Sequence, residues 1–162
     1  LRNPAGFVGS LADVKHHYTQ GIEIRHAVWM WRRVLEVLAY IHSSGWTHNR
    51  LAPEHLLVHP QDHGVFIIGW ADAKADYSRA TIGNDLMCSA AAIKSLLTEQ
   101  GSRPALSDKT HATLAELFQH ASEDSSWCAR LGTQGLEQTL KTIANATFGA
   151  PQFVPFKFNP HF

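Results

Sequence analysis

The chain has 162 residues, a length that suits one domain with a substantial core. Its 14 basic and 14 acidic residues balance, so no long-range field directs it to nucleic acid or to a membrane surface. No apolar run reaches membrane-spanning length, and Cys88 and Cys128 lack the spacing of a zinc module or a disulfide framework. We therefore expect a cytoplasmic protein that binds neither nucleic acid nor membrane.

The first half of the chain predicts two helices and a β-hairpin. Ser10 is a suitable N-cap for a short helix over 11–19. A longer helix is expected over 23–44, because apolar residues recur there at intervals of three and four. The residues of this stripe are Ala27, Trp31, Val34, Leu38 and Ile41. Two short apolar runs, 56–58 and 65–68, flank a polar turn and indicate the hairpin.

The second half predicts three more helices and an extended tail. Apolar periodicity places the helices over 84–99, from Ser107 to about Ala121, and over 133–147. The Pro- and Phe-rich residues 151–162 are expected to form a strap on the surface. The class is therefore mainly α with a small β-hairpin, residues 1–150 forming one domain and 151–162 the strap.

A longer stretch of the sequence matches a known pattern. Residues 38–73 read LAYIHSSGWTHNRLAPEHLLVHPQDHGVFIIGWADA. This text resembles the C-terminal lobe of the eukaryotic-type (Ser/Thr) protein kinases, from the end of the long helix through the His-Arg-Asp loop and the hairpin to the Asp-Phe-Gly element. GSLADV at 9–14 and NDLMCSAAAIKSLL at 84–97 resemble the lobe's first and central helices. The resemblance implies a kinase-like C-lobe.

The residues on which kinase chemistry depends are replaced. A kinase needs a carboxylate for the substrate hydroxyl, a Lys beside the transferred phosphate, and an Asn and an Asp on Mg²⁺. At these positions the chain has Arg50, Ala52, His55 and Gly69. An Arg cannot act as a base, and a His is a poor ligand for a hard cation. We therefore expect no catalytic residue, no cofactor and no ATP binding.

Other parts of a kinase are also missing. The chain begins at Leu1, near the hinge of the resembled fold, so the N-terminal lobe is absent from it. This start indicates either a removed upstream segment or a piece of a larger gene product. Only 13 residues separate Ala71 from Asp85, which leaves little room for an activation segment.

The residues that hold such a lobe together are retained. The resemblance implies that His48 packs into the core and hydrogen-bonds the backbone, and that Asp85 binds backbone N–H groups of the loop. It implies that Pro53 shapes the turn and that Glu54 pairs with a distant Arg. A chain that keeps the structural residues of the kinase lobe but lacks its catalytic residues has the pattern of a pseudokinase.

Two features of the loop region have alternative interpretations. His48, His55, His59 and His63 suggest a metal site, but the loop and hairpin would send these side chains in different directions, so we expect no metal. Arg50 suits a phosphate, although an ion pair with Asp72 or Asp76 is favoured. These alternatives are decided by geometry alone.

The aromatic residues also allow two interpretations. Trp31 falls on the core stripe, whereas Trp29 lies off it and would indicate a docking surface if it were exposed. The tail either docks a partner or covers apolar surface, and covering is favoured. Its aromatic residues are Phe153, Phe156, Phe158 and Phe162.

Taken together, the sequence predicts a catalytically inactive, kinase-like module that serves as a scaffold or a regulatory interaction domain with a protein partner. The alternatives are a divergent phosphotransferase fragment whose nucleotide-binding lobe is supplied elsewhere, and a nucleotide sensor. The absence of metal-binding carboxylates distinguishes the inactive module from these two alternatives, because Mg²⁺–ATP would be bound weakly without such a carboxylate.

Overall fold

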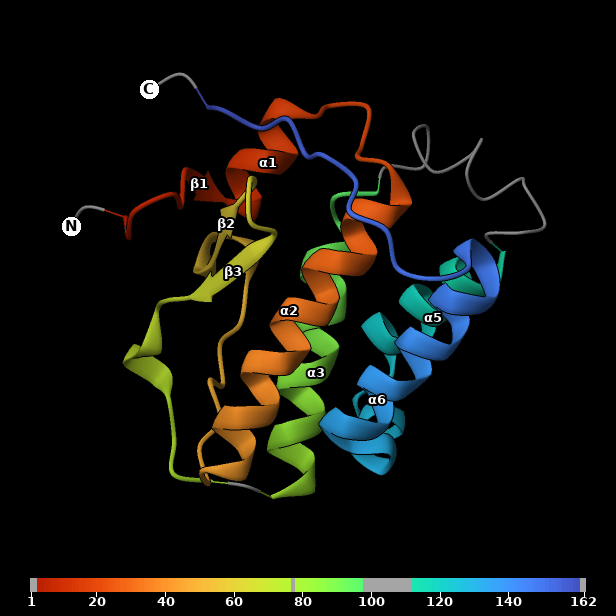
Figure 1. Cartoon of the computed structure of the whole chain (residues 1–162). Helices are drawn as coiled ribbons and strands as arrows, with labels where there is room; N and C mark the ends of the chain where they lie inside the picture. Colours follow the sequence, from red (N-terminus) through yellow and green to blue (C-terminus); the bar gives the residue numbers. More distant parts are fainter. Residues whose placement is uncertain (1–2, 77, 98–111, 161–162) are drawn as a thin grey trace.

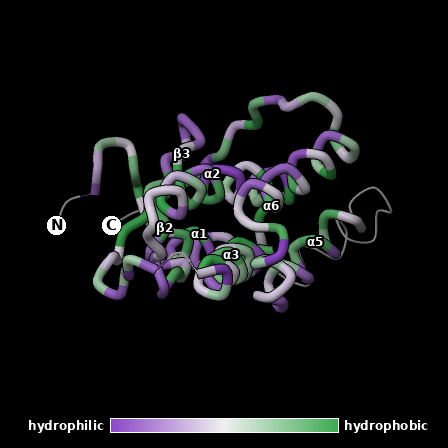
Figure 2. Tube along the Cα trace, turned by 90° about the horizontal axis from the view of Figure 1, so that it is seen from below, coloured by the Kyte–Doolittle hydropathy of each residue, from purple (hydrophilic) through white to green (hydrophobic). Residues whose placement is uncertain are grey.

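The computed structural model describes residues 3–76, 78–97 and 112–160, and it is mainly helical with a small antiparallel sheet, as the sequence predicts. The long helix α2 runs beside α3 through the centre, with the sheet on one side and α5 and α6 on the other (Figure 1). The view from below shows the same order, from the sheet to α5 (Figure 2). The helices are α1 (Leu11–His17), α2 (Ile24–Ser43), α3 (Arg79–Lys94), α5 (Ala112–Glu123) and α6 (Ser125–Phe148).

The predicted hairpin is present and has a third strand. Strands β2 (Leu56–His59) and β3 (Gly64–Ile67) pair antiparallel, with Leu57 opposite Phe66. The additional strand β1 (Gly9–Ser10) pairs with β2, so the order is β1-β2-β3. A strand of two residues is too short to show the alternation of a β-strand, so β1 was not predicted.

The core lies between α2, α3, α5 and α6 and extends under the sheet. Trp31 is fully buried, as its place on the stripe predicts, and its ring centroid lies 5.0 Å from that of Phe118. The indole Nε1 donates a hydrogen bond to Ser89 Oγ at 3.0 Å, so the polar edge of this buried ring is satisfied. One side chain thus ties α2 to both neighbouring helices.

Two helices begin earlier than predicted because their caps were not recognised. Helix α3 starts at Arg79 rather than at 84, since Ser78 Oγ accepts a hydrogen bond from the N–H of Thr81. Helix α6 starts at Ser125 rather than at 133, since an Asp124 carboxylate oxygen accepts from the N–H of Trp127.

Helix α6 contains a kink, which explains the second error. Gly132 has φ 68° and ψ 174°, a conformation outside the helical region, so the apolar period breaks there. Only the segment after the kink was predicted. For the helix predicted from Ser107 to about Ala121, the proposed cap Ser107 lies outside the described residues, and α5 continues two residues beyond Ala121.

The tail is extended, as predicted, and packs against the rest of the chain. In Figure 1 it runs from α6 across the top of α2 toward α1. Phe156 and Phe158 are buried, and the Tyr18 hydroxyl donates a hydrogen bond to the carbonyl of Lys157. Within the described part of the chain, no helix has both the length and the apolarity needed to span a bilayer.

A matched pair of glycines tests the packing of α3 on α6. A Cβ at Gly83 would lie 2.3 Å from the carbonyl oxygen of Ser125, whereas the nearest atom to a Cβ at Gly135 is Leu131 Cβ at 3.5 Å. We expect Gly83→Ala to lower the free energy of unfolding by about 1–3 kcal/mol through overpacking. Gly135→Ala should raise it by up to about 1 kcal/mol through helix propensity. Chemical denaturation measures both, and equal gains in stability would contradict this packing.

Candidate functional site

The carboxylate of Asp85 in α3 anchors the loop between α2 and β2. It is fully buried, and its two oxygens accept hydrogen bonds from the backbone N–H groups of His48 at 2.7 Å and Asn49 at 2.8 Å. His42 Nε2 donates a third bond at 3.1 Å. A buried carboxylate is tolerated only when it is compensated in this way. The loop contacts expected of Asp85 are therefore present.

His42 extends this network to α6. Because Nε2 donates to Asp85, the Nδ1 of a neutral ring accepts a hydrogen bond from Thr133 Oγ1, at 2.7 Å. Thr133 directly follows the kink at Gly132, so the break in α6 places the hydroxyl beside His42. The sequence analysis did not find this residue pair, since 91 positions separate its members.

His48 lies in the core beneath the loop, as expected. Its Nε2 donates to the carbonyl of Ile68 at 2.8 Å, and its Nδ1 accepts from the N–H of Arg50 at 3.3 Å. The Trp70 ring packs edge-on against it, with centroids 4.6 Å apart. Asn49 adopts φ 67°, a left-handed conformation that Asn tolerates better than most residues. The loop is therefore held on one side by Asp85 of α3 and on the other by the bond from His48 to Ile68, the residue after β3.

The structure brings the four replaced positions together around His55. His55 Nδ1 donates to the carbonyl of Arg50 at 2.8 Å. Gly69 faces the same imidazole, because a Cβ built on it would lie 2.5 Å from His55 Cδ2. Ala52 lies at the start of the short helix η1 (Pro53–His55), where its carbonyl accepts the N–H of His55. The imidazole thus fills the space between the loop and Gly69, two residues after the end of β3.

Arg50 is committed to an ion pair. Its guanidinium Nη1 lies 3.3 Å from Asp72 Oδ2, on the short helix η2 (Trp70–Asp72), so the first of the two predicted partners is the observed one. Asp76 instead caps the N–H of Ser78. Both members of the pair are solvent-exposed, so the pair adds at most about 1 kcal/mol to stability.

Two further predicted residues have modest roles. Pro53 opens η1, where its fixed φ and missing N–H suit a first helical position. Glu54 is exposed, and it forms no ion pair with an Arg within the described part of the chain, so the expected pair is not observed there.

The four histidines of the suggested metal site lie in two separate places. The rings of His48 and His55 are 5.4 Å apart, whereas His59 pairs with Asp62 and His63 stacks on Trp29. Within residues 3–76, 78–97 and 112–160, no three His, Cys, Asp or Glu side chains converge as metal ligands.

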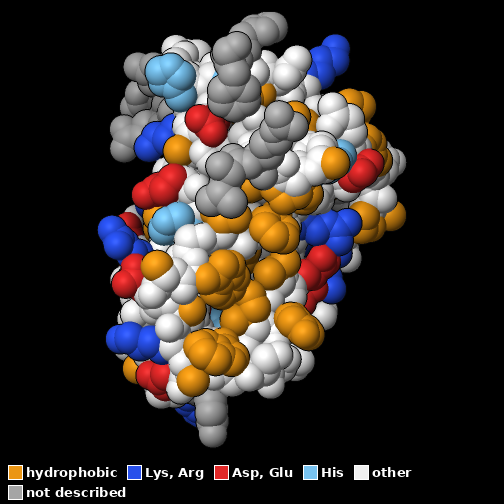
Figure 3. Space-filling view, turned by 90° about the vertical axis from the view of Figure 1, so that its left-hand side faces the viewer, with side chains coloured by type: hydrophobic (Ala, Val, Ile, Leu, Met, Phe, Trp, Pro, Cys, Tyr) orange, Lys and Arg blue, Asp and Glu red, His pale blue; other side chains and the backbone are white. Residues whose placement is uncertain are grey.

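The sequence analysis did not predict an exposed aromatic surface that lies beside the loop. Tyr40, Trp46 and Trp70 surround a shallow groove with Ile41 and Ser44. Tyr40 is 74% exposed and Trp46 49%. Figure 3 shows hydrophobic side chains gathered on this side of the molecule, where β3 and η2 lie. We call these five residues the aromatic groove.

Trp29, the residue that sequence analysis singled out for docking, is not free. Its ring is partly buried and stacks on His63 with centroids 4.1 Å apart and planes 4° from parallel. Phe153 stacks on the other face of His63, and Phe156 contacts Trp29. The tail therefore covers apolar surface here through Phe156 and Phe158, whereas Phe153 remains 62% exposed. Phe162 lies outside the described residues.

No protein-family model and no curated protein matches this sequence. The geometry of the loop and its surroundings therefore carries the functional argument.

The anchoring role of Asp85 gives a stability prediction. Asp85→Ala leaves the N–H groups of His48 and Asn49 without their acceptor, and it should lower the free energy of unfolding by about 3 kcal/mol or more. The matched control is Asp72→Ala, which removes a carboxylate from an exposed ion pair and should cost less than about 1 kcal/mol. Urea denaturation compares the two, and similar losses would show that the Asp85 contacts do not hold the loop.

Proposed function

We propose that this chain is a catalytically inactive, protein-kinase-like C-lobe that acts as a scaffold or regulatory interaction module. The observation that carries the proposal is a loop whose backbone is fixed by Asp85 and His48, while the position of the general base is Arg50 in a salt bridge. A residue that is always protonated cannot accept the proton of a substrate hydroxyl. The loop backbone is therefore held in place, although the position of the general base has a residue that cannot accept a proton.

The environment of Gly69 supports the loss of metal chemistry. Any side chain at this position would meet the His55 ring, because the ring already occupies the space that a Cβ would fill. The backbone there has φ 79°, which disfavours residues other than glycine. An aspartate therefore cannot return to this position unless His55 is also changed.

The aromatic groove supports an interaction role. Exposed Tyr and Trp side chains supply large contact area at low entropic cost, and they dominate binding energy in many interfaces. The groove lies next to the loop, since Trp70 contacts His48 and also lines the groove. We propose that a protein partner inserts apolar side chains between Tyr40, Trp46 and Trp70.

Rebuilding the absent chemistry tests whether the loop is a latent active site. The quadruple variant Arg50→Asp, Ala52→Lys, His55→Asn, Gly69→Asp restores a base, a cation and two metal ligands. We expect neither the original chain nor the variant to transfer labelled phosphate from ATP to the protein itself or to generic acceptors. Catalysis of this reaction depends on a positioned nucleotide, and isolated ligands contribute little.

The outcomes separate the alternatives. Transfer by the original chain would contradict the proposal and favour the phosphotransferase. An Mg²⁺-dependent rise in melting temperature with millimolar ATP, without transfer, would favour the nucleotide sensor instead, since a ligand that binds the native state raises its stability.

Site-specific photo-cross-linking tests the interaction role. A photoreactive amino acid is placed at Trp46 in the groove or, as the matched control, at the exposed Gln134 on α6. In the source cells we expect a discrete cross-linked partner from position 46 and none from position 134. The double variant Tyr40→Ser, Trp46→Ser should abolish recovery of that partner in a pull-down. Equal cross-linking from both positions would argue against a specific interface.

A further inference from the structure

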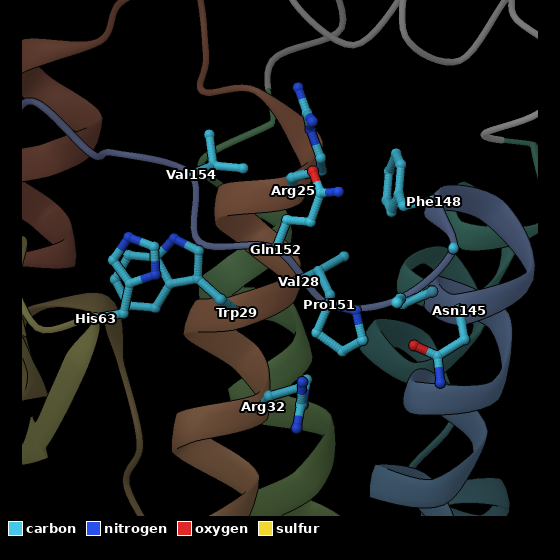
Figure 4. A pocket seen from close by; sticks show the side chains of 13 residues that line it. Arg25, Val28, Trp29, Arg32, His63, Asn145, Phe148, Pro151, Gln152 and Val154 are labelled. Carbon is cyan, nitrogen blue, oxygen red and sulfur yellow. The ribbon is translucent and has the colours of Figure 1, made fainter.

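A cavity lies between α2, α6 and the tail, away from the loop and the aromatic groove. Its volume is about 110 Å³, and it opens to solvent at its mouth. Figure 4 shows Arg25, Val28 and Arg32 on α2 facing Asn145 and Phe148 on α6, with Pro151 and Gln152 of the tail between the two helices. Helix α2, the hairpin turn at His63 and the continuous segment 144–154 therefore build one site.

The lining is basic and contains no acidic residue. Its thirteen residues include Arg25, Arg32 and His63 but no Asp or Glu. Arg25 is already neutralised by Glu23 at 3.0 Å, and its guanidinium also lies over the Phe148 ring. Arg32 makes no ion pair with a described residue, and its Nε is shut off from solvent without an acceptor. A buried N–H without an acceptor costs free energy that a ligand would recover.

His63 supplies a second unsatisfied polar group. Its side chain lines the cavity, the residue is only 8% exposed, and its Nε2 has no hydrogen-bond partner among the described residues. Trp29 and Phe153 hold the ring from both faces. Burial lowers the pKa of His63, a hydrogen bond with the backbone of Val154 opposes this shift, and Arg33 lowers the pKa further. The ring is therefore neutral near neutral pH, and it offers a hydrogen bond rather than a charge.

The remaining walls are mostly apolar. Val28, Trp29, Phe148, Pro151 and Val154 contribute hydrocarbon surface to the lining. A ligand that fills this space needs an apolar body and one polar end.

We infer that this cavity binds a small organic carboxylate whose charged end pairs with Arg32 and whose apolar body packs against Val28, Phe148 and Pro151. The guanidinium fork matches a carboxylate with two parallel hydrogen bonds. A single negative charge is specified because Arg32 is the cation of the lining that lacks a counter-ion, while Arg25 has Glu23. The site is independent of the proposed scaffold role.

Isothermal titration calorimetry on the whole chain tests the inference with three probes. Hydrocinnamate carries the apolar body and the carboxylate, hydrocinnamyl alcohol lacks the charge, and phenyl phosphate replaces the carboxylate with a dianion. We expect hydrocinnamate to bind at submillimolar to millimolar concentration, and the alcohol to bind at least about tenfold more weakly, because a hydrogen bond to a charged group is lost.

Matched variants locate the site. Arg32→Gln should weaken hydrocinnamate binding at least about tenfold, whereas Arg130→Gln, the same change at an exposed position of α6, should leave it unchanged. Ala144→Trp fills the cavity without touching the charge and should abolish binding, whereas Ala146→Trp, on the exposed side of α6, should not.

Three results would overturn the inference: no hydrocinnamate binding at millimolar concentration, equal binding of the alcohol, or an Arg32→Gln affinity within twofold of the original. Tighter binding of phenyl phosphate that also depends on Arg32 would overturn the assignment to a carboxylate.

Discussion

The buried carboxylate of Asp85 is the constraint on which the rest of the site depends. Its partners are the backbone of His48 and Asn49 and the ring of His42, and through His42 the network reaches Thr133. Asp85 on α3 therefore binds the loop and the end of α2 directly, and it is linked to α6 through His42. Because an unpaired buried carboxylate is costly, none of these elements can shift without loss of several hydrogen bonds.

This constraint explains how a loop can be rigid without being reactive. Two polar side chains that face the interior are used to hold the loop itself: Asp85 binds backbone N–H groups, and His48 binds the carbonyl of Ile68. The groups left at the surface neutralise one another, as Arg50 does with Asp72. The apolar surface at Tyr40 and Trp46 remains available near the loop. The proposed interaction role follows because the polar groups here already have partners, whereas these aromatic side chains are exposed.

Much of the fold could be predicted from the sequence, because its signals are local. The stripe of α2, the N-cap at Ser10 and the hairpin of β2 and β3 each depend on residues a few positions apart. The contacts of Asp85 with the loop were expected only through the family resemblance, since periodicity gives no indication of a link between α3 and a loop 36 residues earlier. The family itself remains a proposal.

The missed features depend on contacts between distant residues or on unrecognised caps. Ser78 and Asp124 begin helices that the apolar pattern placed later, and Gly132 interrupts the pattern of α6. Trp29 looked suited to docking because it lies off the apolar stripe of α2, and the helical pattern gives no information on the tail that packs against it. The cavity could not be predicted from the sequence either, because Arg32 and Pro151 line the same space only after the tail has packed.

Native-state hydrogen exchange at the amides of His48 and Asn49 tests the central claim most directly. If Asp85 holds the loop, both N–H groups should open with a free energy within about 1 kcal/mol of that for the buried α3 amide of Leu86. Exchange of both at the rate of an unprotected amide, with Leu86 still protected, would show that the loop is not fixed by this carboxylate and would contradict the account.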